Sequence, residues 1–247
     1  MIPAVRQQSI LNFLNEKKKI AYLDELQQQL NISVSTLRRD LRVLSDTGRV
    51  VLLHGGGVQL TSRSNPESTI TAKLQLNTEA KRKIAYAAVQ TVSDDDVIFL
   101  DPSSTTLEMI PFLVGKKVTV ITNGILHISQ LVANNIRSIM VGGEIKQATN
   151  SCIGPTAETT LQNYFFSKCF LGSNGFSRTA GITNHDMNEC VLKQLAMKNS
   201  AQSYFLLDSS KYNVITMIKV VDLEIPIIYT DASLPELKEY QNIKMIE

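Results

Sequence analysis

Polar runs rich in hydroxyl and acidic side chains recur in this sequence, each directly after a short apolar stretch. The longest, residues 101–106, reads Asp101, Pro102, Ser103, Ser104, Thr105, Thr106. Hydroxyls and free backbone amides at the start of a helix bind anions, because the N–H groups and the helix dipole both favour negative charge. Lys211 closes a second run and can add a full positive charge. The pattern predicts a phosphate site on residues 103–106 and Lys211.

Further runs of this kind supply groups that bind hydroxyls. In a parallel sheet, ligands bind beyond the carboxyl ends of the strands, so these runs are expected to share one edge. Asp101, Asn123 and Asp208 can then bond sugar hydroxyls. Each run alone is weak evidence, since such residues are ordinary in turns. Their repetition favours a polyol-phosphate pocket built from Asp101, Ser103, Ser104, Thr105, Thr106, Thr122, Asn123, Gly142, Gly143, Asp208 and Lys211.

A different chemistry is indicated near the N-terminus, over residues 33–44. Val34, Leu37, Leu41 and Leu44 recur at helical spacing and form one apolar stripe. Ser33 is a favourable N-cap. Small hydroxyl residues at the helix start can meet bases while the arginines behind them bind phosphates. We therefore predict that the side of this helix opposite the apolar stripe, together with its flank, contacts DNA, through Ser33, Ser35, Thr36, Arg38, Arg39 and Arg42.

The elements around this helix complete a winged helix-turn-helix. A helix from Pro3 and a second helix through Leu23, Leu26 and Leu30 precede it, and Gly48 is expected to end it. Residues 49–53 and 58–60 are predicted as strands around the turn 54–57, which forms a wing with His54 at the DNA. The alternative is a three-helix structural module with solvated arginines. The helix cap, the apolar stripe, the basic face and the wing together favour DNA binding.

Charge and composition set the wider limits. Residues 1–60 carry 8 Lys and Arg against 5 Asp and Glu, whereas the remainder carries 17 against 18, so positive charge is concentrated in the DNA-binding module. No apolar run is long enough for a membrane span and no signal core is present, which predicts a cytoplasmic protein with no membrane partner. Three cysteines without metal-ligand spacing predict buried reduced thiols, and no metal or cofactor is expected.

Beyond the polar linker 61–69, residues 70–247 alternate between apolar strands and helical patterns. Helices are expected over 78–92, from about 105, and over 125–134. Strands are expected at 97–100, 118–121, 138–141, 168–171, 203–207 and 227–229. This alternation predicts an α/β domain with a mainly parallel sheet covered by helices.

The pattern from Ser33 to Leu41, with Leu44, Gly48 and residues 54–56, resembles the DeoR family of bacterial sugar-metabolism regulators. The likeness continues through residues 101–106, Thr122, Asn123, Gly142, Gly143, Gly154, Gly172, Gly175, Glu189, Lys193 and residues 208–211, so it spans nearly the whole chain. It implies a winged helix-turn-helix repressor of a sugar-utilisation operon. The sensor domain would be related to ribose-5-phosphate isomerase and glucosamine-6-phosphate deaminase, and a phosphorylated sugar would control DNA affinity.

Two function classes stay open at this point. One is a ligand-responsive repressor that binds operator DNA as a dimer or tetramer and is not an enzyme. The other is a sugar-phosphate isomerase or deaminase that carries a DNA-binding module. Glu189 and Lys193, four residues apart on an expected helix, could be a catalytic base and its partner, but that spacing is also common in surface ion pairs. A weaker third option is a DNA-bound scaffold with an empty sensor domain.

Overall fold

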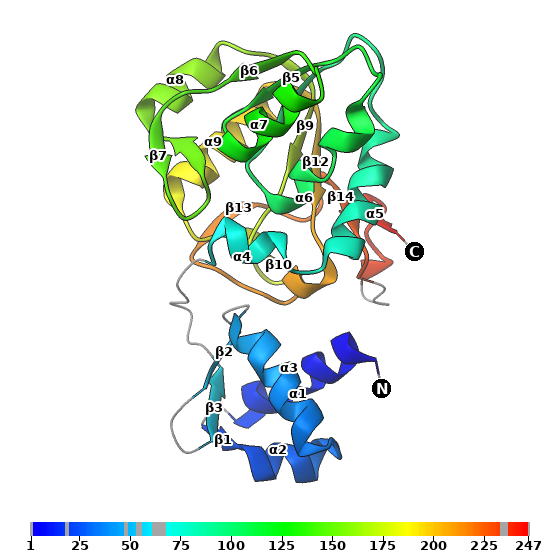
Figure 1. The fold of residues 1–247 in the computed structure, drawn as a ribbon, viewed down its shortest axis with the longest axis vertical. Coiled ribbons are helices and arrows are strands. Elements are labelled where there is room, and N and C mark those ends of the chain that lie inside the picture. Colours follow the sequence, from blue (N-terminus) through cyan, green and yellow to red (C-terminus); the bar gives the residue numbers. More distant parts are fainter. Residues whose placement is uncertain are drawn as a thin grey trace. The chain divides into compact units, whose positions relative to one another are not determined.

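The computed structural model describes residues 2–17, 20–46, 49–52, 56–60, 68–232 and 237–246. The chain forms two compact units, residues 1–68 and 69–247 (Figure 1). The first has one hydrophobic core and the second has two. Most of the expected linker, residues 61–67, lies outside the described residues.

The first unit is a winged helix-turn-helix, as the sequence predicts. Its elements are α1 (Pro3–Lys17), β1 (Ala21–Tyr22), α2 (Leu23–Leu30), α3 (Val34–Asp46), β2 (Val50–Leu52) and β3 (Gly57–Leu60). The strands pair antiparallel in the order β1-β3-β2. The sequence did not predict β1, because a strand of two residues is too short to show an alternation of apolar and polar side chains. The apolar stripe of α3 enters the core with Leu37, Leu41 and Leu44 buried, while Gly48, its expected end, lies outside the described residues.

A seven-stranded sheet, in which every pairing is parallel, forms the centre of the second unit. Its order is β15-β14-β12-β9-β4-β5-β6. In chain order the strands are β4 (Val97–Leu100), β5 (Thr119–Thr122), β6 (Ser138–Met140), β9 (Phe166–Leu171), β12 (Ser200–Leu206), β14 (Ile227–Thr230) and β15 (Ile243–Met245). The expectation of a parallel α/β fold is therefore confirmed, with β15 as an additional edge strand.

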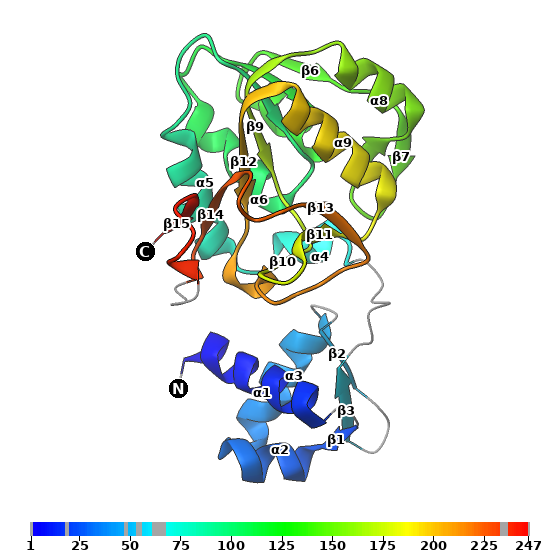
Figure 2. The ribbon, with the colours of Figure 1, turned by 180° about the vertical axis from the view of Figure 1, so that it is seen from behind.

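Strand residues alternate between two cores, one on each face of this sheet. Ile98 and Leu100 pack with Ile84 of α5 (Thr78–Val89) and Leu131 of α7 (Ile125–Ala133). Phe99, between them, packs on the opposite face, where α8 (Pro155–Gln162) and α9 (Met187–Lys198) lie. Figure 1 shows α7 in front of the sheet, and Figure 2, seen from behind, shows α9 in front. Burial on both faces explains why these strands read as continuous apolar runs.

The connectivity reverses direction between β4 and β9. From β4 the chain adds β5 and β6 on one side, and from β9 it adds β12, β14 and β15 on the other. At such a topological switch point, the loops after neighbouring strands diverge and leave a crevice for ligands at the carboxyl edge. Asp101 follows β4 and Gly172 follows β9, so both begin their loops at this point.

Smaller elements surround the sheet. The hairpin β7 (Glu144–Lys146) and β8 (Ser151–Ile153) is antiparallel, as is the sheet of β10 (Gly175–Ser177), β11 (Gly181–Asn184) and β13 (Ile218–Val221). Helix α4 (Ile70–Leu74) opens the unit, and η2 (Ser209–Lys211) follows β12. The sequence indicated none of these, because strands of three or four residues and one-turn helices are too short to show a period. Within the described residues, no helix is long and apolar enough to cross a membrane.

The helix expected from about residue 105 is a single turn. Helix α6 spans only Ser104–Leu107, and the 3-10 turn η1 (Ile110–Leu113) follows it. Pro111 lies in that turn and lacks the N–H that a continuing α-helix requires. One turn sums few peptide dipoles, so anion binding here depends on individual amide and hydroxyl donors.

Candidate functional site

The expected DNA-contacting side of α3 is open to solvent. Ser33, Ser35, Arg38, Arg39 and Arg42 are exposed and Thr36 is half-buried, whereas the leucines of the opposite stripe are buried. Ser33 caps the helix, since its Oγ accepts the backbone N–H of Thr36 at 3.4 Å. His54, the remaining expected contact, lies outside the described residues.

A partly buried ion pair fixes α3 against α1. Asp40, 2% exposed, accepts two hydrogen bonds from the Arg6 guanidinium. Nε donates to Oδ2, and Nη2 donates to Oδ1 at 3.0 Å. Gln7 Nε2 donates to the same oxygen at 3.3 Å. Asp40 is thus the acidic residue within the basic run, and it positions the helix while the arginines beside it stay exposed.

In the second unit, Asp101 joins the two strands of the switch point. Its Oδ2 accepts the backbone N–H of Gly172 at 2.8 Å, and its Oδ1 accepts that of Ser103 at 3.1 Å. A Cβ on Gly172 would lie 2.4 Å from Ser103 Cβ, so this close approach of the two loops requires glycine. The 101–106 loop is consequently held from β9 as well as from β4.

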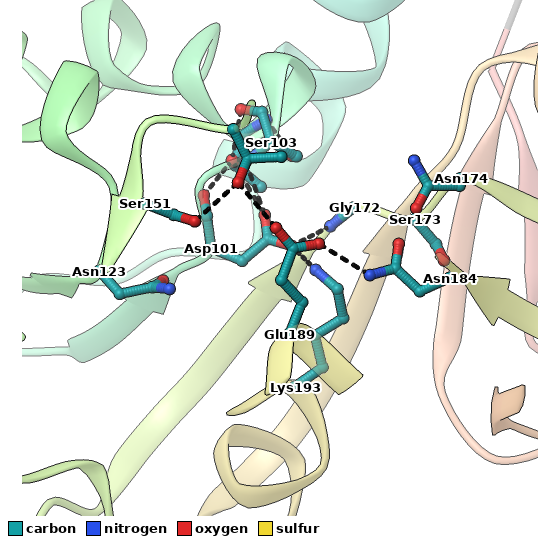
Figure 3. A network of polar contacts seen from close by, with 12 residues as sticks. Asp101, Ser103, Asn123, Ser151, Gly172, Ser173, Asn174, Asn184, Glu189 and Lys193 are labelled. Carbon is teal, nitrogen blue, oxygen red and sulfur yellow. Dashed lines mark hydrogen bonds and ion pairs between the residues drawn. The ribbon is translucent and has the colours of Figure 1, made fainter. Parts of the chain in front are cut away.

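Helix α9 adds a buried charged network to this loop (Figure 3). Lys193 forms an ion pair with Asp101, and both are buried. Glu189, one turn earlier, accepts Thr149 Oγ1 at 2.8 Å on Oε1 and Asn184 Nδ2 at 2.8 Å on Oε2. The interpretation of Glu189 and Lys193 as a surface ion pair is therefore wrong, because both side chains are buried.

The charges in this network hold one another ionised. Burial raises the pKa of Glu189, but the neighbouring Lys193 and Lys146 lower it more, leaving it at about 2. Burial lowers the pKa of Lys193, and the carboxylates of Asp101 and Glu189 raise it above its ordinary value. Lys146 Nζ lies 3.2 Å from Glu189 Oε1 and 3.3 Å from Asp186 Oδ2.

A buried histidine connects the loops after β4 and β5. His127 Nε2 lies 3.0 Å from Thr106 Oγ1, and Thr106 Oγ1 donates to the Asp101 carbonyl at 2.7 Å. Burial lowers the pKa of His127 to about 4, with Asp101 opposing the shift, so the ring is neutral near pH 7. Thr106 and Thr122 are fully buried, and Thr122 Oγ1 accepts the Gly124 amide at 3.0 Å. Their hydroxyls stabilise the loops that carry the site.

Asn123 has an acceptor that the protein leaves unused. Its Nδ2 donates to the Cys152 carbonyl at 2.9 Å, which fixes the orientation of the amide. Among the described buried side-chain atoms, Asn123 Oδ1 and Thr216 Oγ1 have no hydrogen-bond partner. A buried amide oxygen without a partner costs about 1–3 kcal/mol, so it points to a donor supplied from outside.

Two backbone donors in the segment after β4 are also free. In the described part of the chain, no acceptor is found for the amides of Ser104 and Thr105, the first of α6. Gly142 and Gly143 follow β6 at the same edge, and a Cβ on Gly143 would lie 2.5 Å from the Ile153 carbonyl. Gly143 therefore lets β8 pass close to the end of β6.

Asp208 and Lys211 belong to a second polar cluster, after β12. Asp208 is 2% exposed, and its Oδ1 accepts Asn77 Nδ2 at 2.9 Å and the Ser210 amide at 3.1 Å. Burial raises the pKa of Asp208, but the charges of Lys211 and Lys81 and the hydrogen bonds from Ser210 and Asn77 outweigh this effect. The pKa of Asp208 therefore lies below its ordinary value. Lys81 itself is buried, which lowers its pKa to about 8. The carboxylate expected to bind sugar hydroxyls thus ties β12 to the start of α5.

Glu189 and Lys193 were not among the expected ligand-binding residues, but their helical spacing on α9 could have indicated them. Glu189, Lys193 and Ala196 recur at spacings of three and four, together with buried Cys190 and Leu192. Polar residues on an otherwise buried stripe indicate internal partners. All three cysteines are free and buried, as expected. In the described residues, no group of His, Cys, Asp and Glu could hold a metal ion.

Fold and site together define the class: a winged helix-turn-helix unit joined to an α/β unit with a buried polar site at its switch point. Two family models match this organisation. The DeoR-like helix-turn-helix domain matches residues 6–63, and the DeoR C-terminal sensor domain matches residues 76–232. The chain therefore belongs to the DeoR family of transcriptional regulators.

Relatives match over nearly the full length. The chain is 35% identical to the uncharacterized HTH-type transcriptional regulator FruR of Bacillus subtilis, over 100% of this chain and 98% of that protein. It is 32% identical to the L-fucose operon activator of Haemophilus influenzae, over 95% of each. It is 33% identical to the lactose phosphotransferase system repressor of Lactococcus lactis, over 84% and 82%. A ribose-5-phosphate isomerase A of Methanocaldococcus jannaschii aligns over 55% of each chain, with 20% identity and a TM-score of 0.42.

Proposed function

We propose that this regulator represses a sugar-utilisation operon and releases its operator when a phosphorylated sugar binds at the switch point. The observation that carries the sugar site is the buried Asn123 Oδ1, which requires a hydrogen-bond donor. A sugar hydroxyl is such a donor, whereas an ionised phosphate only accepts. The sugar-related names of the relatives, lactose and L-fucose among them, support the same class of ligand.

The phosphate would lie at the other side of the 101–106 loop. The free amides of Ser104 and Thr105 supply donors, with the hydroxyls of the loop beside them and Lys211 as the added charge. Asn123 then holds the hydroxyl end. Asp101 and Asp208, whose carboxylates are bonded within the protein, act by holding the loops in place.

The charge state of Glu189 argues against an isomerase or deaminase. A general base works best with a pKa near the operating pH, whereas that of Glu189 is about 2. Its two oxygens already accept hydrogen bonds from Thr149 and Asn184, and the Lys193 ammonium that could polarise a substrate carbonyl is bonded to Asp101. We propose a binding site without turnover, in a homo-oligomer that reads paired half-sites on DNA in the cytoplasm.

A thermal-shift screen of aldose and ketose phosphates, each beside its free sugar, tests this proposal. A ligand that binds only the folded state raises the melting temperature, so we expect the phosphate but not the free sugar to stabilise the protein. The stabilising compound should also release an operator fragment selected from random DNA, without being consumed. Stabilisation by none of them, or turnover, would contradict the proposal, and tighter DNA binding would indicate an effector acting in the opposite sense.

Two variants, Ser104→Pro and Lys211→Ala, with one control variant, locate the phosphate. Ser104→Pro removes one amide donor at the first helical position, where proline is tolerated and where Ser103 already has the extended backbone that precedes proline (φ −80°, ψ 153°). Ser104→Ala keeps the amide and is the matched control. Lys211→Ala should weaken binding about ten- to a hundredfold through loss of a charge-assisted contact. Equal affinity of Ser104→Pro and Ser104→Ala would move the phosphate off these amides.

A further inference from the structure

The segment that leaves the DNA-binding unit is bonded to a loop of the effector site. Thr69 is the first residue of the second unit, and it caps α4 by accepting the Ala72 amide at 3.4 Å. The next residue, Ile70, is buried, and its backbone N–H donates to the Ala148 carbonyl at 2.8 Å. The start of α4 is therefore attached to the turn between β7 and β8.

That turn, residues 147–150, also contacts the polar network of the site. Thr149, next to Ala148, is buried, and its hydroxyl donates to Glu189 Oε1 at 2.8 Å. Asn150 accepts the amide of Ile125, the first residue of α7, at 2.9 Å. Three consecutive residues, 148–150, thus bind the start of α4, the carboxylate on α9 and the start of α7. A displacement of Thr149 must move Ala148, because they share a peptide plane.

We propose that residues 147–150 are the relay through which effector occupancy reaches the DNA-binding unit. This inference rests on the proposed function. Thr149 donates to Glu189 beside the place where the effector is expected. An effector hydroxyl that takes over Glu189 Oε1 replaces this bond and leaves Ser151 Oγ, at 2.8 Å, as the partner of the Thr149 hydroxyl. The turn then shifts, and the Ile70 amide shifts or loses its acceptor.

The effect on DNA follows from the covalent connection at residues 68 and 69. Half-site spacing on DNA is geometrically fixed, so a change at the point where each DNA-binding unit is attached alters which paired arrangements are reachable. An effector changes operator affinity only to the extent that it binds the two positions of the turn with different free energy. The other end of α4 stays anchored, because Lys81 Nζ donates to the Lys73 carbonyl.

Two substitutions at Ile70 separate this bond from the packing around it. Ile70→Pro removes the N–H that reaches Ala148 at the first position of α4, where proline is tolerated and where Thr69 is already extended (φ −62°, ψ 153°). Ile70→Ala keeps the N–H and truncates the buried side chain by a similar amount. The quantity to compare is the operator dissociation constant with the effector divided by that without it, measured by fluorescence anisotropy on the full chain.

The operator is the DNA fragment selected from a random pool, and the effector is the sugar phosphate that stabilises the wild type most. We expect Ile70→Ala to keep the wild-type ratio and Ile70→Pro to lower it about two- to tenfold, as loss of one hydrogen bond implies. Thermal-shift titration should show that both variants still bind the sugar phosphate. Equal ratios in the two variants would overturn the relay while leaving the proposed function intact.

A second pair covers the case in which Ile70→Pro does not fold. Thr149→Val removes the hydroxyl bonded to Glu189 and Ser151 at nearly unchanged volume, and Thr149→Ser retains it. We expect the ratio to fall in Thr149→Val and to be kept in Thr149→Ser, and equal ratios would again overturn the relay. If no sugar phosphate binds the wild type or changes its operator affinity, the proposed function fails and the relay fails with it.

Discussion

Replacing Lys193 by methionine removes the positive charge from the centre of the sensor unit while keeping much of its volume. Asp101, 1% exposed, then has an ionised carboxylate without its ion-pair partner. Breaking a buried pair by removing one partner costs about 3–5 kcal/mol. The lower end applies here, because Asp101 keeps the amides of Gly172 and Ser103 as donors.

A loss of about 3 kcal/mol lowers the melting temperature of a domain of this size by about 6–12 °C. The near-UV tyrosine signal reports this transition well, because six of the seven tyrosines lie within residues 69–247 and the chain has no tryptophan. Lys83→Met, at an exposed position within α5, is the control and should change the melting temperature little.

The double variant Asp101→Asn with Lys193→Met decides whether the charge itself is responsible. Removing both charges eliminates the uncompensated carboxylate, so the double variant should recover much of the stability lost in Lys193→Met. A melting temperature for Lys193→Met within about 2 °C of the wild type, well inside the shift expected above, would refute this account of the network. A double variant less stable than the single one would show that Lys193 acts through packing.

Other predictions concern the DNA-binding face, the buried histidine, the strand crossing and the domain boundary. Arg39→Ala should weaken operator binding on all sequences and reduce the salt slope by about one unit if it contacts phosphate; unchanged affinity in a gel-shift titration would remove it from the interface. His127 has a pKa of about 4 in the folded chain against an ordinary 6.5, so the unfolded chain takes up its proton first as the pH falls. Stability should therefore drop by about 2 kcal/mol from pH 7 to 5 through this group, and urea unfolding of His127→Gln should lack that part of the slope. Gly172→Ala places a Cβ 2.4 Å from Ser103 Cβ and should destabilise the sensor unit by about 1–3 kcal/mol and weaken sugar-phosphate binding; an unchanged melting curve would contradict the tight crossing. A fragment of residues 69–247, which keeps the Thr69 cap, should fold and bind the effector alone, and an insoluble or ligand-blind fragment would argue against an independent unit.

Local periodicity was enough to predict the elements that are long or strongly patterned. The leucine spacing of α3 fixes which side is buried, and the serines and arginines on the remaining surface are consequently exposed. Apolar strands separated by helical segments predicted the parallel sheet, because strands covered on both faces must be apolar throughout. The carboxyl ends of those strands also indicated correctly where Asp101 and Asn123 would lie, since all parallel strands end at one edge.

The partner of each polar side chain was decided only by the tertiary structure. Lys193 lies four residues from Glu189, yet its ion pair is with Asp101, 92 positions away, because α9 packs on β9 and β4 is paired with β9 at the switch point. Asp208 follows its strand in the same way as Asp101, but its neighbour in space is Asn77, at the start of α5. Sequence spacing determines which face of an element a residue occupies. Which element meets that face depends on strand order and crossover, and these follow from packing over the whole chain.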